Sequence, residues 1–233
     1  MSLKKIAFSL ITFFSLNTLE SQTLPFNVQQ VAHVPNSSFI DPSELNDIWG
    51  WVDSLGNEYA IIGTNKGTSI FDLSVPSNPQ EVFFEPGMNS TWRDVKTHGD
   101  YAYVTTEAMN GLLIIDLSNL PNSANTYFYN GPLNAQWQKA HNLYIDDRGY
   151  AYIFGANRGS GGAIILDLNQ DPTQPVEVAD INNWYVHDGM VKGDTLFLAN
   201  GNNSLFSVWD VSNPSSPNLI GQNPTVGYYS HNI

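Results

Sequence analysis

The sequence predicts an all-β fold, a β-propeller of four-stranded blades, and three observations lead to that prediction. A short apolar strand that ends in aspartate occurs four times, with the aspartates at Asp72, Asp116, Asp167 and Asp210. These positions are 44, 51 and 43 residues apart, and a period of about 40–50 residues filled with short strands is typical of propeller blades. A turn rich in Ser, Asn and Pro follows each aspartate, as expected between antiparallel strands.

Each repeat is expected to form four strands in order. The inner strand begins with a polar pair, and the second strands are expected at 58–63, 101–105, 150–154 and 195–199. The third strand carries the repeated aspartate. The fourth strands, expected at 80–84, 125–129, 176–180 and 218–222, are the least apolar. That composition suits the exposed outer edge of a blade.

The two ends of the chain suggest an incomplete ring. Residues 28–35 resemble a fourth strand without its first three, and we expect them to complete the last blade of a ring. Residues 230–233 match the start of an inner strand. We therefore expect four complete blades plus the start of a fifth, which is a truncated ring from a propeller of at least five blades.

The N-terminus has the pattern of a signal peptide. Lys4 and Lys5 precede an apolar stretch over residues 6–19, and a cleavage site follows Ser21. An uncleaved anchor is the alternative, because Leu19 is not the small residue preferred three positions before the cut. We expect a signal peptide over 1–21 and a partial propeller domain over 22–233. The protein is then secreted by a bacterium, to the cell surface, the medium or the periplasm.

Charge and cysteine content exclude several classes of function. The net charge is −13 with only nine Lys and Arg residues, which excludes nucleic acid and anionic membranes as partners. There is no cysteine, so neither a disulfide framework nor a thiolate metal site can form. The chain also lacks a nucleophile elbow, a P-loop and a dinucleotide fingerprint.

The segment 112–118, Leu-Leu-Ile-Ile-Asp-Leu-Ser, and its three counterparts resemble the LVIVD repeat. The mature chain as a whole is similar to secreted proteins of the choice-of-anchor B type, which are built from that repeat. The resemblance implies propeller architecture and export, with no established reaction. It also implies a C-terminal anchoring or sorting module beyond Ile233.

The starts of the inner strands form the first candidate site. The aligned pairs are Asn46-Asp47, Arg93-Asp94, His141-Asn142, His187-Asp188 and His231-Asn232. Because inner strands line the channel of a propeller, equivalent positions are expected at one height. The residues expected to hold a divalent metal in the channel are His141, His187, His231, Asp47, Asp94 and Asp188. The alternative is that these polar pairs hydrogen-bond to backbone groups of neighbouring blades.

Aromatic residues just before these pairs form the second candidate site. They lie in loops that open on the same end of the channel, and flat rings beside polar groups can grip sugars or peptide side chains. The expected ligand-binding residues are Trp92, Arg93, Trp137, Trp184, Tyr185 and Tyr228. The alternative is that the rings wedge between adjacent blades as part of the core. The repeated aspartates, in contrast, are expected to cap turns rather than to catalyse.

These observations favour a secreted binding or adhesion scaffold for glycan or protein ligands, with no catalysis expected. A metal-dependent enzyme that uses the channel histidines and aspartates is the first alternative. A purely structural module of a multidomain surface protein is the second.

Overall fold

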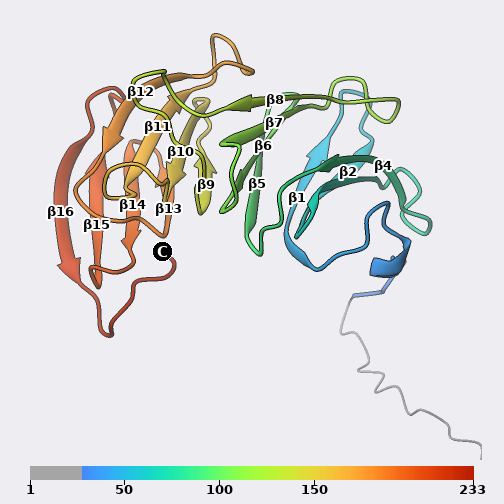
Figure 1. Cartoon of the computed structure of the whole chain (residues 1–233), viewed down its shortest axis with the longest axis horizontal. Coiled ribbons are helices and arrows are strands. Elements are labelled where there is room, and N and C mark those ends of the chain that lie inside the picture. Colours follow the sequence, from blue (N-terminus) through green and yellow to red (C-terminus); the bar gives the residue numbers. More distant parts are fainter. Residues whose placement is uncertain (1–27) are drawn as a thin grey trace, which may run out of the picture. The chain divides into compact units, whose positions relative to one another are not determined.

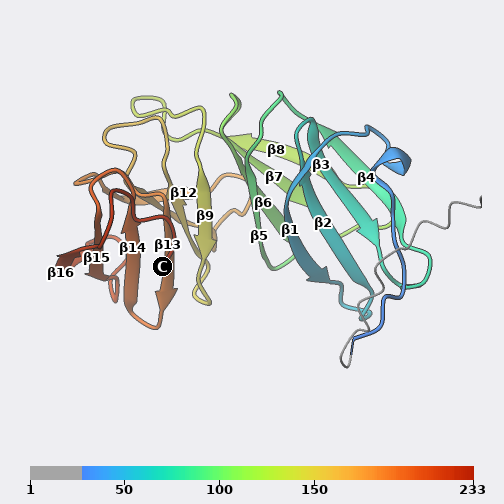
Figure 2. The same cartoon turned by 90° about the horizontal axis from the view of Figure 1, so that it is seen from below.

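The computed structural model describes residues 28–233, and its strands lie in the compact unit Ala32–Ile233. The predicted signal peptide, residues 1–21, falls outside the described residues. Residues 28–233 form four four-stranded antiparallel sheets, each in simple sequential order, and this confirms the predicted all-β propeller blades. Figures 1 and 2 show the four sheets side by side in chain order.

The strand bounds follow the repeat. Blade 1 consists of β1 (Leu45–Val52), β2 (Glu58–Thr64), β3 (Gly67–Asp72) and β4 (Gln80–Pro86). Blade 2 consists of β5 (Arg93–His98), β6 (Tyr101–Thr106), β7 (Leu112–Asp116) and β8 (Asn125–Tyr129). Blade 3 consists of β9 (Asn142–Ile145), β10 (Tyr150–Phe154), β11 (Ala163–Asp167) and β12 (Val176–Ile181). Blade 4 consists of β13 (Asp188–Lys192), β14 (Thr195–Asn200), β15 (Leu205–Asp210) and β16 (Asn218–Pro224).

Apolar clusters between successive blades hold the four sheets together. The middle strands are rich in Ile, Leu, Val and aromatic residues, and their side chains alternate between the two faces of each sheet. One face therefore packs on the preceding blade and the other on the following blade. Tyr103 packs between blades 2 and 3, Tyr152 packs between blades 3 and 4, and both are fully buried. Blades 1 and 2 share a third such cluster around Ile61 and Val95.

The turn after each third strand is built as predicted. In all four blades the aspartate that ends the third strand accepts a hydrogen bond from the backbone N–H two residues later. The donors and distances are Ser74 at 2.7 Å, Ser118 at 3.0 Å, Asn169 at 2.9 Å and Ser212 at 2.8 Å. These aspartates therefore cap turns.

Residues 28–35 are irregular in the described part of the chain and lead into the 3-10 turn Asn36–Ser38. An extended segment becomes a strand only where a neighbouring strand completes its ladder of hydrogen bonds. That these residues complete the last blade of a closed ring stays a prediction. At the other end, Ser230 forms a single antiparallel bridge to Gly201, where a further inner strand was expected to begin.

Candidate functional site at the mouth of the inner strands

Three histidines lie at the end of the inner strands where β5, β9 and β13 begin, which we call the mouth. His141 and His187 each stand one residue before an inner strand, and their backbone N–H groups donate to the second strand of the same blade. The acceptors are the carbonyls of Phe154 and Ala199, each at 2.9 Å. His231 follows Ser230, and Ser230 forms a β-bridge to Gly201, the residue directly after β14. The propeller repeat thus brings three imidazoles from successive positions to one height.

The three imidazoles form a tilted stack, with angles of 49° and 43° between neighbouring ring planes. The ring centroids of His141 and His187 are 4.2 Å apart, and those of His187 and His231 are 4.1 Å apart. His187 therefore has an imidazole on each side, and a proton on either neighbour disfavours a proton on His187.

Hydrogen bonding fixes the tautomer of His187. Its Nδ1 lies 2.7 Å from the backbone carbonyl oxygen of His231. A carbonyl can only accept, so Nδ1 carries the proton and Nε2 keeps its lone pair. Burial lowers the pKa of His187, and the neighbouring charge of His141 lowers it further. His187 is therefore a neutral imidazole with a basic Nε2 near neutral pH.

His141 is oriented in a similar way by a carboxylate. Its Nδ1 lies 2.7 Å from Oε1 of Glu107, which follows β6 in the neighbouring blade. An ionised carboxylate only accepts hydrogen bonds, so Nδ1 of His141 is protonated and its Nε2 faces away from this bond. Sequence reasoning missed Glu107, because it lies in a loop after a second strand and has no repeated counterpart.

Two tyrosines stand beside the stacked rings. The ring of Tyr229 meets that of His187 edge-on, with centroids 5.4 Å apart. The hydroxyls of Tyr185 and Tyr229 lie close enough to influence each other. Burial raises the pKa of Tyr185 to about 12, and burial also raises that of Tyr229. Both phenols therefore stay protonated at neutral pH and can donate hydrogen bonds.

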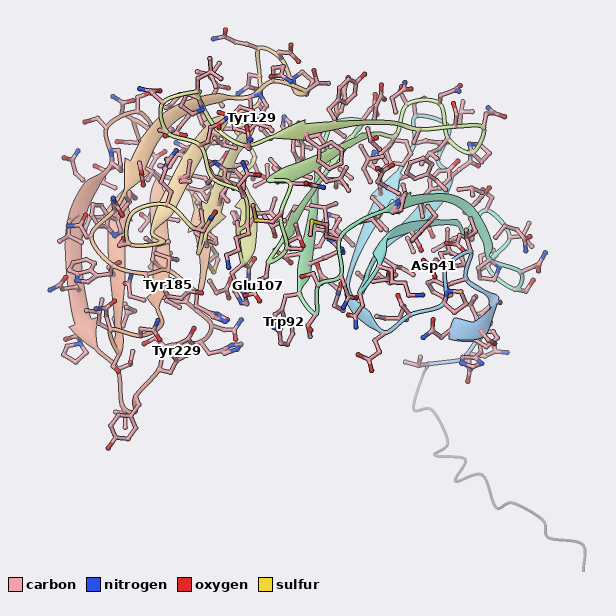
Figure 3. The ribbon with its side chains drawn as sticks, viewed as in Figure 1. Asp41, Trp92, Glu107, Tyr129, Tyr185 and Tyr229 are labelled. Carbon is pink, nitrogen blue, oxygen red and sulfur yellow. The ribbon has the colours of Figure 1, made fainter. Side chains whose placement is uncertain are left out.

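Trp92 is the exposed aromatic of the site. Its ring centroid lies 6.3 Å from that of His141, and 53% of the residue is accessible to solvent. Its backbone carbonyl accepts from the hydroxyl of Ser90 at 2.8 Å and from the N–H of Glu107 at 3.4 Å. Figure 3 shows Trp92, Glu107, Tyr185 and Tyr229 on the same side of the molecule, with Tyr129 on the opposite side.

Glycines make room for these rings. Gly155, just after β10, has a φ of +65°, and an added Cβ would lie 2.8 Å from Cβ of His141 and 3.1 Å from the hydroxyl of Tyr185. A Cβ at Gly201 would lie 2.8 Å from the ring of Tyr229. Both contacts are too close for any side chain, so the close packing of the mouth depends on glycine at these positions.

The other predicted ligand-binding residues lie elsewhere. Trp137 is 1% exposed and belongs to the core between blades 2 and 3. Trp184 is half-buried and packs against the core between blades 3 and 4. Tyr228 is 97% exposed. Arg93 is buried, and its guanidinium donates to the backbone carbonyls of blade 1 and of the loop that leaves it. Trp137 and Trp184 therefore pack between blades, which is the alternative considered for these rings.

The carboxylates predicted as metal ligands connect blades instead of joining the histidines. Each aspartate accepts hydrogen bonds from groups of the adjacent blade or repeat. Successive side chains of a strand point to opposite faces, so the aspartate points away from the residue before it. Asp47 accepts from the N–H of Val95 at 2.9 Å, Asp94 from the N–H of Leu143 at 3.0 Å, and Asp188 from the side-chain amides of Asn142 at 3.1 Å and Asn232 at 2.8 Å. Within residues 28–233, no group of three or more His, Asp and Glu side chains is placed to hold a metal ion.

One of these carboxylates has an altered pKa. Burial raises the pKa of Asp94 to about 7, although Lys96, whose Nζ lies 2.9 Å from Oδ1, favours the charged form. The carboxyl sits deep between the blades and contacts backbone and lysine rather than open space. It therefore belongs to the scaffold that holds the inner strands together.

The fold and the site define a β-propeller with stacked imidazoles and aromatic rings at one mouth. Three of its segments match the LVIVD repeat, residues 54–84, 91–126 and 185–225, which cover most of blades 1, 2 and 4. The chain therefore contains LVIVD repeats. No curated protein matches it significantly in sequence.

Several solved structures share the fold. The chain superposes on a putative 6-phosphogluconolactonase from Bacteroides uniformis with a TM-score of 0.62 and 12% identity, covering 87% of this chain and 61% of that one. The periplasmic gluconolactonase of Pseudomonas aeruginosa gives a TM-score of 0.58 at 12% identity, covering 78% and 54%. A putative 6-phosphogluconolactonase from Bacteroides fragilis gives 0.56 at 12% identity, covering 80% and 56%. The chain thus spans 54–61% of the length of these three structures.

These comparisons correct the expected function. The sequence favoured a glycan- or protein-binding adhesion scaffold without catalysis, and that prediction is contradicted, because propellers that share this fold include a gluconolactonase and putative 6-phosphogluconolactonases. The error came from treating the aromatic residues of the mouth as one binding surface. Two of them are packed between blades, and the carboxylate that orients an imidazole, Glu107, was not considered.

Proposed function

We propose that the mouth is the active site of a hydrolase that opens a carboxylic ester or lactone bond in a small substrate. The observation that carries this proposal is the hydrogen bond from Nδ1 of His187 to the carbonyl of His231, together with the lowered pKa of His187. A neutral imidazole with one tautomer held in place is a general base suited to neutral pH. The likeness of the fold to a gluconolactonase and to a putative 6-phosphogluconolactonase supports the reaction class.

The residues of the mouth can be given roles in that reaction. Nε2 of His187 takes a proton from water as the water oxygen attacks the carbonyl carbon. The hydroxyl of Tyr229 donates to the oxyanion that forms. The bond from the carbonyl carbon to the ring oxygen then breaks, and the proton held by His187 passes to the leaving alkoxide. The product is the hydroxy acid, with one water consumed.

His141 and Trp92 complete the site in this proposal. Glu107 holds His141 with its Nε2 free, so this imidazole can hydrogen-bond a substrate hydroxyl. The ring centroid of Trp92 lies 6.3 Å from that of His141, and its exposed face offers an apolar platform for the body of the substrate. The stacked rings thus supply the base, a polar anchor and a platform from neighbouring blades.

Hydrolysis of D-glucono-1,5-lactone, followed by acid release above the spontaneous rate, tests the proposal. We expect the full chain to accelerate the reaction and His187→Gln to reduce kcat/KM by about 10²–10⁴-fold, the usual contribution of a general base. His98→Gln is the matched control, because His98 ends β5 at the far end of that strand from Arg93. No acceleration by the native chain, or equal rates for the native chain and His187→Gln, would overturn the assignment.

We also propose that the protein is exported and belongs to the choice-of-anchor B type. The apolar N-terminal stretch after Lys4 and Lys5 and the LVIVD repeats support this. None of the helices in the described residues is long and apolar enough to cross a membrane. Mass spectrometry of the protein recovered from a bacterial host should give Gln22 as the first residue, and an intact Met1 on the exported protein would contradict a cleaved signal.

A further inference from the structure

Most of the positive charges in the described residues are in contact with other groups of the scaffold. Lys4 and Lys5 lie outside the described part, and four of the other lysines and arginines have their charged groups in ion pairs. These pairs are Lys66 with Asp41 at 2.7 Å, Lys96 with Asp94 at 2.9 Å, Arg148 with Asp146 at 2.8 Å and Arg158 with Glu177 at 2.7 Å. Such residues offer no free cation to a ligand.

Arg93 is turned away from the mouth. It occupies the position of blade 2 that His141 and His187 occupy in blades 3 and 4. Its Nε nevertheless donates to the carbonyl of Thr64 at 2.8 Å, and its Nη2 donates to that of Met88 at 2.6 Å. The residue is only 6% exposed, and burial lowers its pKa to about 10. To reach a ligand, the guanidinium would have to abandon two buried carbonyls, which is costly.

Two cations of the described residues remain. Lys192 ends β13, whereas the mouth lies at its start. Lys139 is exposed and stands two residues before His141, but the same histidine is bound to the carboxylate of Glu107. A phosphate dianion is usually held by several charge-assisted donors, Arg above all. Here it would meet one lysine, an adjacent carboxylate and a protein of net charge −13.

The exposed surface of the mouth suits a neutral ring. Trp92 presents an open aromatic face, and the protonated hydroxyls of Tyr185 and Tyr229 are donors suited to alcohols and carbonyls. Resting on the proposed function, we infer that the substrate is an uncharged, ring-shaped polyhydroxy lactone and that the site discriminates against its phosphorylated form. The inferred substrate therefore differs from the phosphorylated lactone for which two proteins that share its fold, both putative 6-phosphogluconolactonases, are named.

Paired substrates test the inference directly. kcat/KM is measured for D-glucono-1,5-lactone and for its 6-phosphate on the full chain, and we expect at least a tenfold preference for the neutral lactone. Binding is measured separately by calorimetry with glucose and glucose 6-phosphate, two rings of the same shape that the enzyme cannot hydrolyse. Glucose should bind at least tenfold more tightly. Lys139→Gln should weaken glucose 6-phosphate further, and Lys192→Gln should change neither affinity.

The outcomes separate this inference from the proposed function. Equal or greater kcat/KM for the phosphorylated lactone would overturn the inference and leave the hydrolase in place. Preferential binding of glucose without hydrolysis of either lactone would overturn the hydrolase and support the ligand class. Glucose 6-phosphate binding as tightly as glucose, or neither sugar binding, would overturn the inference whatever the rates show.

Discussion

The Oδ2 atom of Asp94 accepts a hydrogen bond of 3.0 Å from the backbone N–H of Leu143, and this contact joins the inner strand of blade 2 to that of blade 3. Asp47 makes the equivalent bond to Val95 of the following blade at 2.9 Å. A repeated carboxylate thus satisfies a buried backbone donor of the next blade, where no sheet ladder can reach it. The inner strands are held to one another by these side chains as well as by apolar packing.

Replacing Asp94 should destabilise the protein without touching the histidines. Asp94→Ala leaves the N–H of Leu143 without its acceptor, which we expect to cost about 1–3 kcal/mol in the free energy of unfolding. Asp94→Asn keeps an oxygen acceptor and should cost less. Urea denaturation of the three proteins measures this, and an alanine variant as stable as the native chain would show that the contact does not hold the blades.

The contribution of His187 to the stability of the protein should rise with pH in the range where histidine titrates, opposite in sign to that of Asp94, whose pKa is raised to about 7. The pKa of His187 is lowered in the folded state, so below about pH 6.5, the ordinary value, the unfolded chain binds a proton that the folded chain does not. The contribution of His187 is therefore lost as the pH falls and recovered as it rises. His187→Gln, whose amide can still donate to the carbonyl of His231, should flatten this part of the profile of melting temperature against pH.

The same profile supplies its own control. His98→Gln removes a histidine from the far end of β5 and should leave the rise with pH in place. If His187→Gln keeps the full slope, the stacked imidazoles are not the source of the pH dependence, and the base assigned to the reaction loses its physical support.

Gly155 should be intolerant of a side chain for a reason that Gly193 does not share. Both have positive φ, +65° and +59°, so alanine is strained at each. At Gly155 the new Cβ would also lie 2.8 Å from His141, whereas at Gly193 nothing lies within 4 Å. Gly155→Ala should therefore lower the unfolding free energy by about 1–3 kcal/mol more than Gly193→Ala, as expected of overpacking.

Lactone hydrolysis distinguishes the two glycine variants further. Gly155→Ala should reduce it because the ring of His141 is displaced, while Gly193→Ala should hydrolyse at the native rate. Similar losses of stability in both variants would indicate that backbone strain alone matters, and equal activity would show that the packing around His141 does not position the site.

The turn aspartates should stabilise the protein through the hydrogen bond that one carboxylate oxygen accepts. Oδ1 of Asp116 accepts from the N–H of Ser118 at 3.0 Å, and asparagine retains an oxygen at this position. Asp116→Ala should lower the melting temperature, and Asp116→Asn should restore most of it. A calorimetric scan that finds the two variants equally destabilised would show that the negative charge, rather than the turn hydrogen bond, is what the repeat preserves.

Much of the fold was predictable because its signals are local. The second strand of blade 2 was expected at 101–105 and is found at Tyr101–Thr106. The turn after each third strand was predicted from residue type, since its donor lies two residues from its acceptor. Residues 28–35 have the composition of a fourth strand but are irregular in the described structure. Forming a strand also depends on a neighbouring ladder, which the sequence pattern alone does not specify.

The candidate site was predictable only in part. Alignment of the repeats placed His141, His187 and His231 at one height, and the structure stacks their rings at 4.1–4.2 Å. The direction of each neighbouring side chain was not available from the alignment. Asp94 points to the next blade, and Arg93 fills the space between blades 1 and 2.

The sequence by itself determined that this protein is a β-propeller arc of four blades, because period, strand composition and turn residues act within a single repeat. The tertiary structure decided which residues face one another across blades. Glu107 meets His141 at 2.7 Å over a separation of 34 residues, and His187 meets the carbonyl of His231 over 44. Those contacts depend on how successive sheets pack and twist. The fixed tautomer and the lowered pKa of His187 therefore arise only in the folded chain.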